Sequence, residues 1–138
     1  MSGLSLTRTY HFSAGHRLEN PALSAEENAR VYGQCFRQHG HNYLLEVTVA
    51  GALDPVTGMS ADIRALDSAV EAAVLGRVDH YDLSAAVPDL KGVITTGENL
   101  ARTFWEWLRA ALPPGTLRRV AVVETANNTF EYRGTEAR

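Results

Sequence analysis

The chain has a single cysteine, Cys35, in the segment GQCFRQHGHNY, where His39 follows four residues later and His41 two residues after that. A thiolate can act as a base or a nucleophile, and a nearby cation or metal ion lowers the pKa of a thiol. A free cysteine is more often an inert, buried apolar residue. The residues around Cys35 are polar and favour the reactive interpretation: Gln34, Arg37 and Gln38.

His39 and His41 form an H-x-H pair, with Gly40 between them. Residues two apart in a strand point to the same face, so the two imidazoles converge. Such a pair supplies two zinc ligands, and a catalytic zinc site needs a third protein ligand with one position left open. His16, at the inward parity of an earlier predicted strand, is the natural third ligand. Spacing alone leaves open a pair of hydrogen-bonded histidines beside a turn.

Four further polar residues have both a functional and a structural interpretation. Asp79 and His80 are adjacent in VDHYDLS, but neighbouring side chains point in different directions, so a surface loop is the simpler interpretation. Glu124 interrupts an apolar strand near its end and is either an exposed strand terminus or a ligand anchor. Glu98, in TTGEN, fits a capping box at the entrance of a helix.

The elements that must position these residues follow from hydrophobic periodicity. Alternating apolar residues predict strands, and the last two are joined through Asn127-Asn128, a hairpin signal. Residues 19–38 are polar and contain Pro21, which predicts a loop with at most a short helical turn. The predicted strands cover residues 4–18, 41–53, 117–126 and 129–134.

Apolar stripes at helical spacing predict two helices between the second and third strands. One begins after Asp62, a good N-cap, and ends near Arg77; the other runs from about Gly97 to Leu112. The order ββααββ predicts an α+β fold, in which a four-stranded antiparallel sheet carries two helices on one face. Such a sheet has two open edges, so we expect oligomerisation to cover them.

Composition limits the class of protein. The 138 residues are 45% hydrophobic, which suits a single domain spanning 1–138. A net charge of −3 and a pI near 5.9 predict no nucleic-acid partner. No apolar run approaches the roughly 20 residues that cross a bilayer, and we expect no membrane association. One cysteine cannot form an intrachain disulfide, which favours a reducing, cytoplasmic location.

Six segments, in their order and spacing, carry a resemblance to one known family: FSAGHRL, C-x3-HGHNY, DPVTGM, VDHYDLS, TTGEN and VVETANN. From about Leu6 to Gly134 the sequence resembles the 6-pyruvoyltetrahydropterin synthase and 6-carboxytetrahydropterin synthase family. The resemblance implies a tunnelling fold (T-fold), in which trimers close a barrel and two trimers stack into a homohexamer. It also implies active sites between subunits, with Cys35 and the Asp79–His80 pair coming from different chains.

The resemblance further implies roles for the residues introduced above. The family's substrate is the small molecule 7,8-dihydroneopterin triphosphate, whose side chain a zinc ion activates as a Lewis acid. A cysteine thiolate then acts as general base, a histidine oriented by aspartate shuttles protons, and triphosphate is lost. The matching residues are His16, His39 and His41 for zinc, Cys35 for the base, Asp79 and His80 for the proton shuttle, Glu124 for the pterin anchor, and Glu98 for a second substrate-side glutamate.

The resemblance covers two branches with different products. One stops at 6-pyruvoyl-tetrahydropterin, on the route to biopterin; the other also releases acetaldehyde and leaves 6-carboxy-5,6,7,8-tetrahydropterin, on the route to deazapurines such as queuosine. The C-x3-HGH spacing is similar to the bacterial carboxy-forming branch, whereas LSAEENARVYGQC, DPVTGM and ANNTFEYRG are closer to the animal pyruvoyl enzymes. We expect the carboxy-forming activity, with the pyruvoyl product as the alternative.

Two other activities are weighed against this lyase. A folate-pathway variant of the family cleaves the side chain differently and usually carries glutamate near the cysteine position, so Cys35 argues against it. A non-catalytic metal- or pterin-binding module would be favoured if Cys35 or His80 were missing, and both are present.

Overall fold

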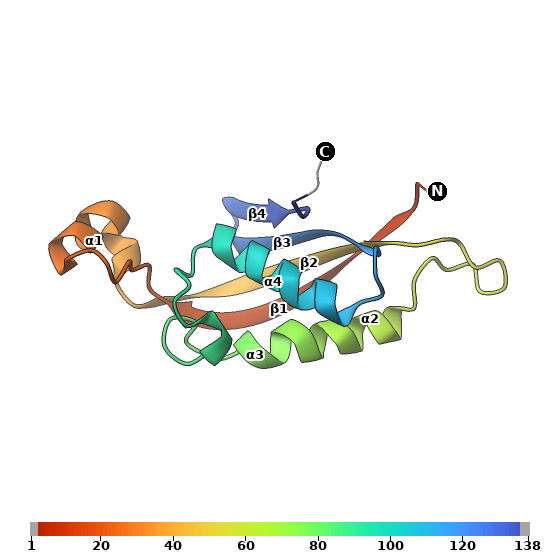
Figure 1. Cartoon of the computed structure of the whole chain (residues 1–138), viewed down its shortest axis with the longest axis horizontal. Helices are drawn as coiled ribbons and strands as arrows, with labels where there is room; N and C mark the ends of the chain where they lie inside the picture. Colours follow the sequence, from red (N-terminus) through yellow and green to blue (C-terminus); the bar gives the residue numbers. More distant parts are fainter. Residues whose placement is uncertain (1–2, 136–138) are drawn as a thin grey trace.

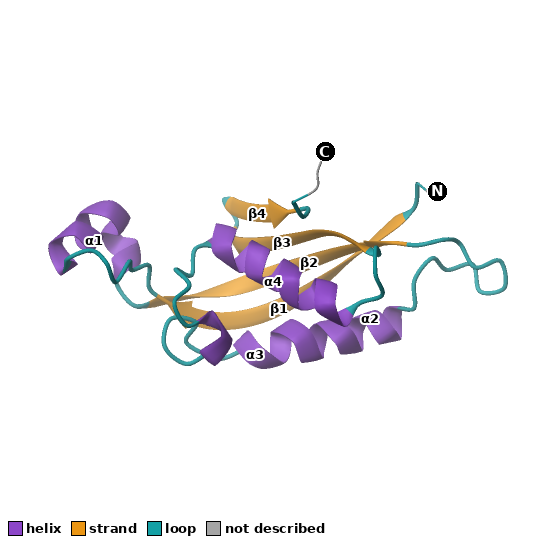
Figure 2. Cartoon of the chain, in the orientation of Figure 1, coloured by secondary structure: helices purple, strands orange, loops and turns teal. Residues whose placement is uncertain are grey.

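In the computed structural model, which describes residues 3–135, four antiparallel strands form one sheet in the order β1-β2-β3-β4. Helices cover one face of this sheet (Figures 1 and 2). The predicted ββααββ order and α+β class are confirmed. The strands are β1 (Ser5–His16), β2 (His39–Ala50), β3 (Leu117–Thr125) and β4 (Asn128–Tyr132). The helical segments between β2 and β3 are α2 (Ile63–Val70), the π-helical turn η2 (Glu71–Leu75), α3 (Gly76–Val78), the 3-10 turn η3 (Pro88–Leu90) and α4 (Gly97–Ala111).

The core lies between the sheet and these helices. Strand alternation places one face of β1 and β2 toward the helices, as the sequence predicted, and Phe12, Tyr43 and Leu45 are fully buried there. The rings of Phe12 and Tyr43 stack with their centroids 4.6 Å apart. β1 and β2 pair over their whole length, from Ser5 opposite Ala50 to His16 opposite His39.

The first predicted helix forms as α2, η2 and α3 in succession. Asp62 is the N-cap, since its carboxylate accepts a hydrogen bond from the Ala65 N–H at 3.1 Å. The π-helical turn at Glu71–Leu75 was not predicted. In α4 the buried face includes Trp105, which is 8% exposed, whereas Ala111 at the end of the helix is exposed.

The predicted loop over 19–38 is wrong in part, because it contains the helix α1 (Ala25–Tyr32) and the 3-10 turn η1 (Gly33–Phe36). α1 begins with a complete capping box: Ser24 accepts from the Glu27 N–H, and the Glu27 carboxylate accepts from the Ser24 N–H. Figure 1 places α1 at one end of the molecule, beyond the end of the sheet.

Other boundaries also differ from prediction. β2 begins at His39, two residues early, and the β3–β4 turn is Ala126-Asn127, with Asn128 already in β4. The capping box predicted around Glu98 does not form. Thr96 is the N-cap of α4 and accepts from the Asn99 N–H, which leaves Glu98 exposed in the first turn.

Gly97 allows α4 to pack closely on β4, because an added Cβ would lie 2.0 Å from Cδ2 of Phe130. We expect Gly97→Ala to cost about 1–3 kcal/mol of unfolding free energy through overpacking. Urea unfolding measures this cost. The double variant Gly97→Ala/Phe130→Val should be more stable than Gly97→Ala, since the smaller side chain makes room for the methyl group. Wild-type stability of Gly97→Ala would show that the contact relaxes without cost.

Candidate active site

Three histidines meet at the helix-facing side of the sheet, where β1 ends and β2 begins. His16 and His39 are directly opposite each other in the β1–β2 pairing, and His41 is opposite Ala14. One candidate ligand atom from each histidine lies within 4.8 Å of the other two. The side chain of His16 is fully buried, and those of His39 and His41 are partly buried. The structure thus brings together the three residues that the H-x-H spacing and strand parity selected.

Backbone carbonyl groups orient two of these imidazoles. Nδ1 of His16 is 2.9 Å from the Thr95 carbonyl oxygen, and Nδ1 of His39 is 2.7 Å from that of Arg37. A carbonyl oxygen only accepts, so each Nδ1 carries the proton and donates it. In the neutral ring this hydrogen bond leaves Nε2 as the unprotonated nitrogen, which is the arrangement typical of metal-binding histidines.

Burial favours the neutral form of His16 and His41. Desolvation, reinforced by the neighbouring His39, lowers the pKa of His16. Desolvation also lowers the pKa of His41, although the Glu124 carboxylate acts in the opposite direction. A metal binds the neutral imidazole, so the donor set and its protonation state fit a metal ion.

Glu124 on β3 faces the same space. Its Oε2 atom lies 3.9 Å from Nε2 of His16 and 3.9 Å from Nε2 of His41, and its side chain is 14% exposed. These distances are too long for hydrogen bonds. The low exposure shows that Glu124 is not an exposed strand terminus. Because its carboxylate makes no hydrogen bond to the histidines, it is available to accept hydrogen bonds from a ligand beside them.

Tyr43 is a site residue that the sequence analysis assigned only to the core. Its hydroxyl is 3.4 Å from Nε2 of His16, and the side chain is fully buried. Burial, reinforced by Glu124, raises the pKa of the Tyr43 phenol, so this group stays protonated. The signal was available, since Tyr43 has the same strand parity as His39 and His41.

Asp79 and His80 make contact, contrary to the expectation from their adjacency. Nδ1 of His80 is 2.9 Å from Oδ1 of Asp79. His80 has a φ of +67°, in the left-handed region. Ser13 of β1 holds both residues: its N–H donates to the Asp79 carboxylate at 2.9 Å, and its carbonyl accepts from the His80 N–H at 2.6 Å.

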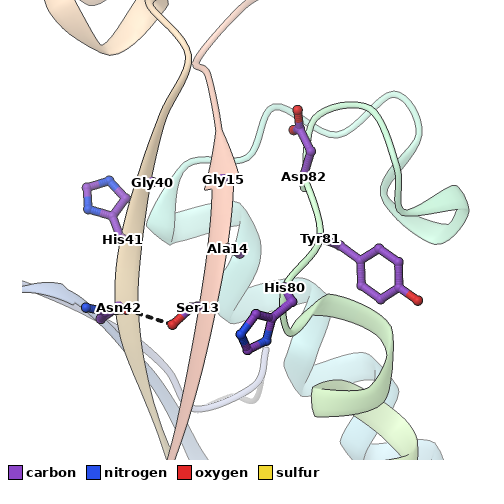
Figure 3. Close-up of a pocket in the computed structure, with 9 residues that line it drawn as sticks. All are labelled: Ser13, Ala14, Gly15, Gly40, His41, Asn42, His80, Tyr81 and Asp82. Carbon is purple, nitrogen blue, oxygen red and sulfur yellow. Dashed lines mark hydrogen bonds between the residues drawn. The ribbon is translucent and has the colours of Figure 1, made fainter.

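The Asp79–His80 pair is held against β1 through Ser13, whereas the histidine group (His16, His39 and His41) is formed by the end of β1 and the start of β2. The His80 side chain is 80% exposed and borders a pocket of about 510 Å³. Figure 3 shows His80 beyond one side of β1 and His41 on the other side. His41 also lines this pocket, together with Ser13, Ala14, Gly15, Gly40, Asn42, Tyr81 and Asp82.

Cys35 and Glu98 lie apart from these groups. The Cys35 thiol is exposed on η1 and is not among the candidate metal-ligand atoms found in residues 3–135. Glu98 is exposed on the first turn of α4. One chain therefore assembles the histidines with Glu124 and, separately, Asp79 with His80, but it does not enclose all the predicted residues in one site.

A family model described as 6-pyruvoyl tetrahydropterin synthase matches residues 5–135. The chain belongs to this family. A solved structure of 6-pyruvoyl tetrahydropterin synthase from Caenorhabditis elegans is similar to it with a TM-score of 0.91 and 36% identity, covering 96% of each chain. This similarity agrees with the tunnelling fold that the sequence motifs implied.

Two relatives bear on the two branches of the family. A Dictyostelium discoideum protein named 6-pyruvoyl tetrahydrobiopterin synthase is 43% identical over 129 residues, covering 94% of this chain and 95% of that protein. An Aquifex aeolicus protein named 6-carboxy-5,6,7,8-tetrahydropterin synthase is 29% identical over 157 residues, covering 93% and 96%. Within residues 3–135, no helix has the length and apolar character needed to span a membrane.

The histidine group should determine metal content. Replacing His16, His39 or His41 with alanine should reduce bound metal from about one ion per chain to a small fraction, because a site with three protein ligands loses one. His11→Ala is the matched control, since His11 is exposed on the other face of β1. Mass spectrometry of metals in zinc-loaded, dialysed protein measures the content.

The same site predicts a pH dependence. Protons compete with the metal for the imidazoles, and the pKa values of His16 and His41 lie below the ordinary 6.5. Metal should therefore be retained at neutral pH and released as the pH falls below 6.5, through these lowered pKa values. For the preceding experiment, equal metal content in the wild type and the three alanine variants would contradict the assignment of His16, His39 and His41 as metal ligands.

Proposed function

We propose that this protein is an enzyme that converts 7,8-dihydroneopterin triphosphate to 6-pyruvoyl-tetrahydropterin with loss of triphosphate. The observation that carries the choice of product is the difference between relatives: 43% identity to a protein named for the pyruvoyl product, against 29% to one named for the carboxy product. The sequence-based preference for the carboxy product rested on the short Cys35–His39 spacing. That spacing keeps the carboxy product as the second candidate.

We assign the metal position to His16, His39 and His41, and zinc suits their three nitrogen donors. A bound zinc ion supplies Lewis-acid activation of the hydroxyl-bearing side chain of the substrate. The protein's own contribution is orientation, because the Thr95 and Arg37 carbonyls direct Nε2 of two histidines into the site. The buried Tyr43 hydroxyl borders the same space.

Glu124 is the proposed anchor of the pterin ring. A carboxylate can accept two hydrogen bonds, one from a ring N–H and one from the exocyclic amine of the pterin. Support comes from its position 3.9 Å from two of the metal-site histidines and from its low exposure. Glu98, at the entrance of α4, is proposed as a second carboxylate on the substrate side.

Cys35 is the proposed general base, and His80, held by Asp79, the proposed proton shuttle. The strained backbone of His80 supports this role, because a left-handed non-glycine residue costs on the order of 1–3 kcal/mol and such strain concentrates at functional sites. The three bonds that join Asp79 and His80 to each other and to Ser13 offset that cost. A free thiolate suits a reducing compartment, so we propose a cytoplasmic location.

The enzyme reaction can be tested directly by product identification. Incubation of the zinc-loaded protein with 7,8-dihydroneopterin triphosphate should release triphosphate and give the 6-pyruvoyl product, detected by mass spectrometry. Acetaldehyde together with a 6-carboxy product would show that the second candidate is the correct one. No turnover of this substrate would contradict both.

Two variants separate the proposed roles. Cys35→Ala should lower turnover by about 10²–10⁴-fold, the usual contribution of a general base, while pterin affinity and zinc content stay unchanged. Glu124→Gln should instead weaken pterin binding, since an amide offers one acceptor oxygen where the carboxylate offers two. Near-wild-type turnover of Cys35→Ala would remove the thiol from the mechanism.

We also propose a homohexamer of two trimers, with each active site shared between subunits. The support is that β1 and β4 are sheet edges and that the His80 side chain, beside β1, is exposed. A neighbouring subunit docked at such an edge would add its own residues to the site. Light scattering should give the mass of about six chains, and a stable, active monomer would exclude the shared site.

A further inference from the structure

Arg17 connects the histidine group to the turn that carries Cys35. It directly follows His16 in sequence, and its guanidinium carbon lies 4.3 Å from the centroid of the Phe36 ring. Phe36 is the residue after Cys35 and the last residue of η1. The next residue on the β1 side, Leu18, donates its N–H to the Cys35 carbonyl at 2.8 Å. The two chain segments therefore contact each other through one side-chain stack and one backbone hydrogen bond.

The Arg17 backbone is itself held from the opposite side. The Ser84 hydroxyl accepts from the Arg17 N–H at 2.9 Å and donates to the Arg17 carbonyl at 3.1 Å. The same hydroxyl is 3.5 Å from Oγ1 of Thr95, the residue whose carbonyl orients His16. Arg17 is thus anchored to the segments that fix the histidine group, and only its side chain reaches toward the Cys35 turn.

The Cys35 turn needs such an anchor because of its place in the fold. It ends an excursion, residues 17–38, whose helix α1 lies beyond the end of the sheet (Figure 1). α1 packs on η1, so the helix and the turn support each other. Their position relative to the histidines then depends on the contacts made where the excursion leaves β1 and returns to β2.

The stack requires the guanidinium itself. Arginine presents a planar group that lies flat on an aromatic ring, whereas a lysine ammonium is a compact, strongly hydrated charge. The Arg17 Nε atom is buried without a hydrogen-bond partner, which is energetically unfavourable. A terminal nitrogen of the same group lies 3.3 Å from the Glu19 carboxylate. The burial of Nε against Phe36 therefore lowers the stability of the fold. A surface arginine that was free to turn toward water would avoid this loss.

We propose that Arg17 is a positioning residue, which fixes the Cys35 turn relative to the histidine group by stacking on Phe36. The inference rests on the proposed role of Cys35 as the base. A base displaced by about 1 Å can lose on the order of 10²-fold in rate, because proton transfer needs a near-attack geometry. Arg17 acts through Phe36 and the turn, and does not itself touch the reacting atoms.

Hydrogen exchange and kinetics test the proposal together. In Arg17→Lys and in Phe36→Leu, the Leu18 amide should exchange several-fold faster, because its acceptor is the Cys35 carbonyl of the released turn. Turnover should fall by roughly 10- to 100-fold, with KM and zinc content nearly unchanged. Phe36→Tyr keeps the ring and should behave as the wild type. Arg30→Met, which removes an exposed arginine on α1 of the same excursion, is the control and should leave both measurements unchanged.

Other outcomes overturn the proposal. Unchanged exchange at Leu18 in Arg17→Lys, with turnover reduced, would mean that Arg17 acts elsewhere; a raised KM would indicate direct contact with the substrate's triphosphate. Unchanged exchange and unchanged turnover would remove Arg17 from the site altogether. If Arg17→Lys does not fold, Phe36→Leu tests the same stack from its other side. If the wild type does not turn over the substrate, the proposed function fails, and exchange at Leu18 still decides whether Arg17 holds the turn.

Discussion

The register of β1 against β2 is the constraint on which the site depends. It places His16 opposite His39 and the small Ala14 opposite His41, so that three imidazoles face one another with little bulk between them. A slip of one residue would turn every side chain of a strand to the other face of the sheet. The stacked pair Phe12 and Tyr43 lies in the same register and belongs to the buried core. The interactions that build the core therefore also build the candidate metal site.

The features of this fold that lower its stability are concentrated at the end of the sheet that carries the histidines. His16 is fully buried with a lowered pKa, His80 has a left-handed backbone, and the Arg17 Nε atom is buried without a partner. A protein selected for stability alone would avoid each of these features, and natural proteins break local rules mainly where function demands it. Hydrogen bonds to Thr95, Ser13 and Ser84 keep this end of the molecule in place.

The orientation of residues that follow the two-residue period of a strand could be predicted from the sequence. The contacts of residues that depend on one local backbone dihedral angle could not. Strand parity identified the inward face of β1 and β2 and the convergence of the histidines. It could not show that Asp79 meets His80, because the contact occurs together with a left-handed backbone at His80, φ +67°, that no periodicity predicts. The helix α1 was missed although Ser24 and Glu27 carry its capping box. The Cys35–His39 spacing favoured the carboxy branch, but it measures the length of a surface excursion, and such lengths change at little thermodynamic cost.

The proposed site residues of one chain are distributed around the edge strand β1, and His41 and His80 line one pocket there. His80 lies beyond one side of β1 with its imidazole exposed, whereas His41 and Glu124 lie on β2 and β3. A barrel closed through strand edges would bring His80 of one subunit toward the histidines of the next. In the proposed assembly, each subunit contact formed at the edge of β1 also completes an active site. Catalytic activity would therefore depend on the association equilibrium of the subunits. A substitution at that edge would reduce activity by weakening subunit association, although it changes none of the proposed metal ligands, the proposed base or the proposed pterin anchor.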